Sequence, residues 1–115
     1  MNLATLIAKR AEEGQPIRVG MIGAGKFGTM FLAQAERQRG IHIIGICDLN
    51  PEATRSNLAL ANWNLERYAA KSLDAAAKNG TTHVGDNWEA LVNHPAVEII
   101  IECTGNPMAA VTHIL

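Results

Sequence analysis

The chain has 115 residues, a formal net charge of −1 and 48% hydrophobic residues. This length suffices for one compact domain and is too short for two. The balanced charge and an aromatic content of only 4% exclude both the basic surface and the stacking platform that nucleic-acid binding requires.

The first predicted element is an amphipathic helix at Asn2–Glu13, which Gly14 and Pro16 end. Its charged residues follow the apolar ones instead of preceding them, so the segment is not a secretory signal peptide. Apolar runs such as Val97–Ile101 are far too short to span a bilayer. We therefore expect no membrane partner.

Strand-like runs and helix-like patterns then alternate along the chain. Ile17–Ile22 is a short apolar run that ends at glycines, and a helical pattern follows it directly. Ile41–Cys47 (IHIIGIC) is β-branched and nearly continuous, which is typical of a strand covered on both faces. Asn50 followed by Pro51 begins a helix that we expect to continue to about Ala61.

The second half of the chain continues the alternation. Its expected elements are a helix at Leu65–Lys78 with Gly80 past its end, a weak strand at Thr82–Gly85, a short helix begun by a capping box of Asp86 and Glu89, a strand at Val97–Thr104, and a final helix begun by Asn106 and Pro107.

This alternation predicts an α/β fold with a parallel sheet and right-handed crossovers. A complete doubly wound dinucleotide-binding sheet has about six strands, and about four are predicted here, in the order 3-2-1-4. We interpret the chain as an incomplete Rossmann-type domain at 16–115, preceded by the helix at 1–15. We also expect the chain to be the first part of a longer protein, because it stops within an apolar pattern.

Three glycines at the end of the first predicted strand form a G-x-G-x-x-G pattern. Gly23 permits a sharp turn, Gly25 lets the backbone approach a pyrophosphate, and Gly28 lets the next helix pack closely on the strand. The amino end of that helix offers unpaired N–H groups and a positive dipole end to phosphates. The alternative is a tight turn without a ligand.

An acidic residue at the end of the second strand favours the dinucleotide. Asp48 lies where a carboxylate accepts hydrogen bonds from the adenosine ribose hydroxyls. A carboxylate there repels a 2′-phosphate, which favours NAD. Lys26, Asn50 and Arg55 are near enough in sequence to help accommodate NADP, so NADP stays open.

The end of the fourth predicted strand reads ECTGNP. In the expected strand order it lies beside the first strand, across the crevice in which ligands of such sheets bind. Thr104 and Gly105 are therefore predicted to line the nicotinamide-ribose half, and Asn106 to cap the next helix.

Other reactive residues are interpreted as structural. Cys47 and Cys103 lie near the ends of apolar runs on separated strands, which indicates reduced core thiols of a cytoplasmic protein. The four histidines lack metal-ligand spacing, so we expect no metal site and interpret each as surface or structural. Trp63 and Trp88 are interpreted as packing residues.

The stretches IRVGMIGAGKFGTMFLAQ, IHIIGICDLNPE and VEIIIECTGNP resemble the amino-terminal part of homoserine-dehydrogenase-like oxidoreductases with a C-terminal SAF domain. Within that group the chain is most similar to the 1-deoxy-D-xylulose 5-phosphate reductoisomerase-like (DRL) enzymes. The resemblance covers essentially all 115 residues, but only the cofactor half of such an enzyme.

This resemblance implies an NADP-dependent reductoisomerase that acts on a sugar phosphate, with a divalent metal, in isoprenoid precursor synthesis. The family's metal and catalytic residues would lie beyond Leu115, so this chain alone is expected to be inactive. The residues that carry over as cofactor contacts are Gly23, Gly25, Lys26, Phe27, Gly28, Asp48, Thr104 and Gly105, together with Ala24 inside the glycine loop.

Three alternatives remain open at this point. A homoserine-dehydrogenase-type enzyme shares the sheet and a similar glycine loop. A non-catalytic NAD(H)-binding sensor or scaffold would need the same crevice. An S-adenosylmethionine methyltransferase also uses a glycine loop and an acid, although Gly28 and the TGNP strand end argue against it. We expect the intact enzyme to form homo-oligomers and to bind a small-molecule substrate through a further domain.

Overall fold

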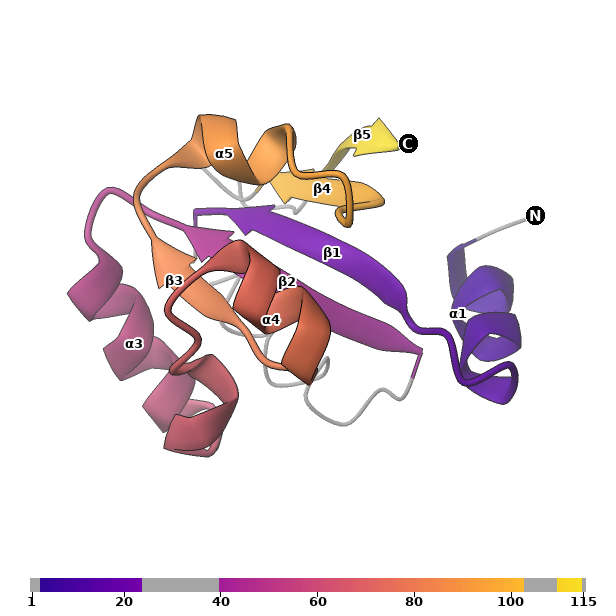
Figure 1. The fold of residues 1–115 in the computed structure, drawn as a ribbon, viewed down its shortest axis with the longest axis horizontal. Coiled ribbons are helices and arrows are strands. Elements are labelled where there is room, and N and C mark those ends of the chain that lie inside the picture. Colours follow the sequence, from indigo (N-terminus) through magenta and orange to yellow (C-terminus); the bar gives the residue numbers. More distant parts are fainter. Residues whose placement is uncertain (1–2, 24–39, 103–109, 115) are drawn as a thin grey trace.

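A computed structural model describes residues 3–23, 40–102 and 110–114 (Figure 1). In these ranges the strands form one sheet in the order β3-β2-β1-β4-β5. The first four pair in parallel and β5 pairs antiparallel with β4. The α/β class and the predicted 3-2-1-4 order are therefore confirmed. The strands are β1 (Ile17–Ile22), β2 (Ile41–Cys47), β3 (His83–Gly85), β4 (Ile99–Glu102) and β5 (Ala110–Ile114).

The helices begin at capping residues that their sequences supply. Asn50 Oδ1 accepts a hydrogen bond from Ala53 N at 3.2 Å, and Pro51 takes the first helical position, as predicted. Gly80 ends α4 in the left-handed conformation, with φ of 71°. The described helices are α1 (Leu3–Glu12), α3 (Pro51–Leu60), the 3-10 helix η1 (Leu65–Tyr68), α4 (Leu73–Asn79) and α5 (Trp88–Val92).

The helix predicted at Leu65–Lys78 is two separate helices, η1 and α4. Ser72 accounts for the break, because its Oγ accepts a hydrogen bond from Ala75 N at 3.1 Å and caps a new helix. The capping prediction before α5 is also wrong by one residue. Asn87, not Asp86, caps α5, with Oδ1 accepting from Ala90 N at 3.0 Å.

The prediction of a final helix is wrong where the structure describes it. Ala110–Ile114 is a strand that pairs antiparallel with β4. Val111, Thr112 and Ile114 are β-branched, which favours a strand when a sheet edge is available for pairing. The predicted start of that helix at Asn106, and the helix predicted after the glycine loop, lie outside the described residues.

The sheet is covered on both faces by separate apolar clusters. One cluster joins the strands to α3 and includes Met21, Leu58 and Trp63. The other joins them to α4 and α5, and includes Ala76 and Leu91. In Figure 1, α4 crosses in front of β2. This double cover explains why the apolar run of β2 is nearly continuous.

Close packing of α4 and α5 on β2 depends on a glycine. A Cβ at Gly45 would lie 2.6 Å from Leu73 Cδ2 and 2.7 Å from Leu91 Cδ1. Real Cβ atoms essentially never come so close to other atoms, so a larger residue at this position would require the side chains of Leu73 and Leu91 to shift.

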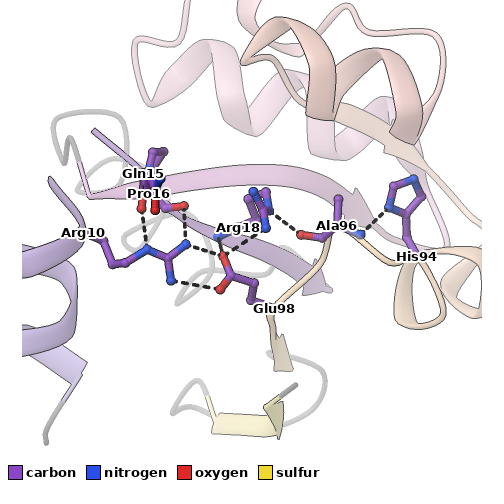
Figure 2. A network of polar contacts seen from close by, with 7 residues as sticks. All are labelled: Arg10, Gln15, Pro16, Arg18, His94, Ala96 and Glu98. Carbon is purple, nitrogen blue, oxygen red and sulfur yellow. Dashed lines mark hydrogen bonds and ion pairs between the residues drawn. The ribbon is translucent and has the colours of Figure 1, made fainter. Parts of the chain in front are cut away.

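An ion-pair network fixes α1 to the amino end of the sheet (Figure 2). Arg10 Nη1 and Nη2 donate to the two carboxylate oxygens of Glu98 at 2.9 and 2.8 Å. The backbone N of Arg18 donates to the same carboxylate at 3.1 Å, and Arg18 Nε donates to Ala96 O at 2.7 Å. The hydrogen bond from Arg10 is the main reason that the pKa of Glu98 lies below its usual value.

This network predicts a pH-dependent part of the stability. Because the folded-state pKa of Glu98 is lowered, its contribution is fully present above the unfolded pKa and is lost as pH falls through the folded pKa. We expect Glu98→Gln to lower the free energy of unfolding by about 1–3 kcal/mol at pH 7. In urea unfolding, this difference from the unsubstituted chain should shrink at pH 3.

Glu12→Gln is the matched control, because Glu12 is exposed on α1, the helix that carries Arg10. We expect it to change the stability by less than about 0.5 kcal/mol at either pH. An equal loss from Glu98→Gln at pH 7 and pH 3 would show that the carboxylate charge is not what stabilises the contact.

Candidate functional site

Backbone hydrogen bonds join three parallel strands at their carboxyl ends. Gly23, which follows β1, has φ of 79° and donates its N–H to Cys47 O at 2.7 Å. Asp48, which follows β2, donates its N–H to Gly85 O at 3.0 Å. A left-handed φ directly after β1 favours glycine, and it agrees with the sharp turn predicted at Gly23. Gly23, Asp48 and Gly85 therefore lie along one edge of the sheet.

The carboxylate of Asp48 is positioned by the first turn of α3. Thr54 Oγ1 donates to Asp48 Oδ2 at 3.2 Å, and Asn50 N lies 3.4 Å from Oδ1. Thr54 is completely buried, whereas Asp48 is only partly exposed at the edge. Sequence reasoning missed Thr54. The signal was a hydroxyl residue six positions after the acid, in the first turn of a helix begun by Asn50 and Pro51.

The structure describes two of the predicted cofactor contacts, Gly23 and Asp48, and it brings them to the same edge. The other predicted contacts lie outside the described residues: Ala24, Gly25, Lys26, Phe27, Gly28, Thr104 and Gly105.

Two residues considered for NADP make other contacts. The side-chain oxygen of Asn50 caps α3 through Ala53 N. Arg55 forms an ion pair with Glu52 on the same helix, and its Nη2 donates to Val84 O at 3.3 Å. Both side chains therefore contact residues of α3 or β3.

A cavity of about 380 Å³ lies between α4, α5 and the carboxyl ends of β2 and β3. No sequence pattern predicted it. Its apolar lining includes Leu73, Ala90 and Leu91. The polar and sulfur-containing side chains in the lining are Cys47, Lys71, Ser72, Asp74, His83, Asp86, Asn87 and His94.

The histidines make structural contacts, as predicted, in the part of the chain that is described. His42 Nε2 donates to Thr81 O at 2.8 Å, and burial lowers the pKa of His42. His94 accepts from Ala96 N at Nδ1, so Nε2 carries the proton that bonds Asp74 at 2.7 Å. For His113, the structure describes only the backbone, in β5.

The cysteine and tryptophan predictions have mixed outcomes. Cys47 is a buried free thiol, and burial raises its pKa, which fits the predicted core role. Trp63 is buried, as predicted, but Trp88 is 54% exposed, so its predicted packing role is wrong. Trp88 is the first residue of α5. Cys103 lies outside the described residues.

Two expected absences concern metals and membranes. Within residues 3–23, 40–102 and 110–114, no group of three His, Cys, Asp or Glu side chains is arranged to hold a metal ion. The described helices are also all too short or too polar to cross a bilayer.

A comparison with known protein families identifies a match. The GFO_IDH_MocA family, described as "Oxidoreductase family, NAD-binding Rossmann fold", matches residues 17–113. The match covers β1 to β4 completely and β5 as far as His113, and it excludes α1. Comparison with curated proteins finds no matching relative.

Proposed function

Because the chain belongs to the GFO_IDH_MocA oxidoreductase family with an NAD-binding Rossmann fold, we propose that its sheet edge binds the cofactor of an NAD(P)-dependent oxidoreductase. Residues 16–115 would form the cofactor-binding domain, and residues 1–15 an accessory helix. The observation that carries this proposal is the carboxylate of Asp48, which Thr54 orients beside the left-handed turn at Gly23. A ribose needs such a hydrogen-bond acceptor at this place.

The dinucleotide supplies hydride transfer, and this chain binds and orients it. Gly23 has the left-handed φ that a sharp turn after β1 needs, and in such a turn the backbone of a glycine loop would approach phosphates. Asp48 accepts hydrogen bonds from the adenosine ribose. The proposed contacts further along the chain are Ala24, Gly25, Lys26, Phe27 and Gly28 at the pyrophosphate, and Thr104 and Gly105 at the nicotinamide ribose.

We favour NAD over NADP for this crevice. The carboxylate of Asp48 would repel a 2′-phosphate, and the cation nearest to it in sequence on α3, Arg55, is already paired with Glu52. Lys26 is the remaining candidate to offset that repulsion. The DRL resemblance points instead to NADP, so the choice of cofactor separates a general dehydrogenase of this family from a DRL-like enzyme.

The resemblance extends the proposal to a class of reaction. A DRL-like enzyme would reduce and isomerise a sugar phosphate with the help of a divalent metal, in isoprenoid precursor synthesis. Homoserine-dehydrogenase-type chemistry is the second candidate, since it needs the same crevice. The substrate and the metal would be held by a further domain, and the intact enzyme would be a cytoplasmic homo-oligomer. Turnover of a sugar phosphate by this chain alone would contradict that arrangement.

Direct titration tests the proposal. We expect NADH to bind this chain with a dissociation constant lower than that of NADPH, measured by the change in nicotinamide fluorescence. S-adenosylmethionine is the control ligand, because methyltransferases also place an acid after the second strand. Binding of S-adenosylmethionine without binding of either dinucleotide would overturn the oxidoreductase proposal. Binding of NADH without turnover by the intact protein would support a sensor instead.

A further inference from the structure

Two threonines, Thr54 and Thr82, are buried among the described residues. Both hydroxyls have a hydrogen-bond partner, as buried polar groups require. Thr82 Oγ1 donates to Ile43 O at 2.5 Å, a backbone carbonyl in the first half of β2. Thr54 Oγ1 donates instead to a side chain of the candidate site, at Oδ2 of Asp48. The two threonines are therefore alike in burial and differ in the group that each one holds.

Neither packing nor helix capping requires a hydroxyl at position 54. Thr54 is 0% exposed and shares the buried face of α3 with Leu58, where a valine of nearly the same shape would need no polar partner. The side chain of Asn50 already caps the helix. The contact with Asp48 is therefore what the hydroxyl of Thr54 adds to the fold.

We propose that Thr54 is a positioning residue that determines cofactor specificity, because its hydroxyl holds the Asp48 carboxylate in the orientation that binds the ribose and excludes a 2′-phosphate. This inference rests on the proposed function, since it requires a dinucleotide with its ribose at Asp48. Thr54 is buried beneath the site and would not touch the cofactor. It acts through Asp48.

Donors from the start of α3 restrain both oxygens of the carboxylate. Thr54 Oγ1 lies 3.2 Å from Oδ2 of Asp48, and Asn50 N lies 3.4 Å from Oδ1. A carboxylate offers about four acceptor positions, so one hydroxyl on Oδ2 does not saturate it. The orientation of the carboxylate is then set before a ligand arrives, and less side-chain entropy is lost when a ribose binds.

These two donors are uncharged, and this matters for the choice of cofactor. A hydroxyl and a backbone N–H orient the carboxylate, whereas a lysine or arginine in their place would offset its negative charge. Arg55, on the same helix, is paired with Glu52 and donates to Val84 O. Thr54 therefore directs the charge of Asp48 without neutralising it. A directed charge both accepts from a ribose hydroxyl and repels a phosphate.

Thr54→Val tests the proposal, because it removes the hydroxyl and keeps the shape of the side chain. We expect this variant to bind NADH about 2- to 12-fold more weakly, since its carboxylate regains rotational freedom. NADPH affinity should change by less than about twofold, because the freed carboxylate can also turn away from the 2′-phosphate. Titrations followed by nicotinamide fluorescence give both dissociation constants. An unchanged ratio of the two would overturn the proposal.

Thr82→Val is the matched control, since it removes a similarly buried hydroxyl that bonds Ile43 O instead of the site. It should leave the ratio of the two affinities unchanged. If Thr54→Val folds poorly, Thr54→Ser and Thr54→Ala pose the same question, because both lack the methyl group and they differ in the hydroxyl. The preference for NADH should be retained in Thr54→Ser and reduced in Thr54→Ala. Equal preference in these two variants would overturn the proposal.

A double-mutant cycle separates positioning from a general structural effect. In the Asp48→Ala background, Thr54→Val should change NADH affinity by less than about twofold, because the group that Thr54 holds is gone. An equal loss in both backgrounds would show that Thr54 acts through the packing of α3, and it would overturn the inference. NADH binding that Thr54→Val leaves intact would overturn this inference alone. Binding of neither dinucleotide by the unsubstituted chain would overturn the proposed function itself.

Discussion

Asp48→Ala is expected to weaken NADH binding by roughly 10- to 150-fold while NADPH binding changes by less than about fivefold. Hydrogen bonds to a charged group are worth about 1.5–3 kcal/mol, and each 1.4 kcal/mol is tenfold in affinity. The loss of NADH affinity should lie near the upper end of this range, because Thr54 Oγ1 already holds the carboxylate in place. NADPH should lose less, since removing the charge also removes its repulsion of the 2′-phosphate.

Parallel titrations of both dinucleotides would measure this change of preference. Glu66→Ala is the matched control, because it removes the same charge from an exposed position on η1. It should leave both affinities within about twofold, because surface charges away from the crevice are screened by salt. An equal loss of NADH and NADPH affinity in Asp48→Ala would show that Asp48 does not contact the ribose.

The strands could be predicted because each carries its own local signal, and the doubly wound fold then gave their order. The apolar run at Ile41–Cys47 indicates a strand buried on both faces, and the structure confirms it between two clusters. The cap at Asn50 and the glycine at Gly80 are local as well, and both hold. Asp48 could be placed from sequence because it directly follows such a strand.

Features that depend on pairing at long range could not be predicted. The apolar pattern of residues 110–114 is compatible with a helix or a strand, and the antiparallel edge of β4 decides between them. The contact between Arg10 and Glu98 joins residues 88 positions apart. Helical spacing continues across Ser72, so only its capping hydrogen bond reveals the break before α4.

The cavity is another feature that depends on long-range packing and could not be predicted from the sequence. It exists because α4 packs on the face of the sheet that α5 also covers, and its lining comes from four separate segments of the chain. The orientation of the His83 ring depends on its hydrogen bond with the carbonyl oxygen of Ala70, which no residue pattern encodes. The chemistry of a residue could be predicted from sequence here, but the direction in which its polar atom points could not.

Met21→Ala is expected to cost the most stability of any substitution considered for this chain. Met21 is completely buried on the central strand β1, where it pairs with Ile46 of β2 and Ile101 of β4. Truncating a buried methionine costs about 2–5 kcal/mol, because the transfer energy is lost and a void remains. Met21→Leu keeps nearly the same volume and should cost less than about 1.5 kcal/mol.

Thermal unfolding would separate the two variants. A loss of 1 kcal/mol lowers the Tm of a domain of this size by about 4–8 °C, so Met21→Ala should fall by at least about 8 °C. NADH should still raise the Tm of Met21→Leu, because the ligand stabilises whichever fraction is folded and Gly23 and Asp48 are unchanged. A Tm for Met21→Ala within about 3 °C of that of the unsubstituted chain would contradict the placement of Met21 at the centre of the core.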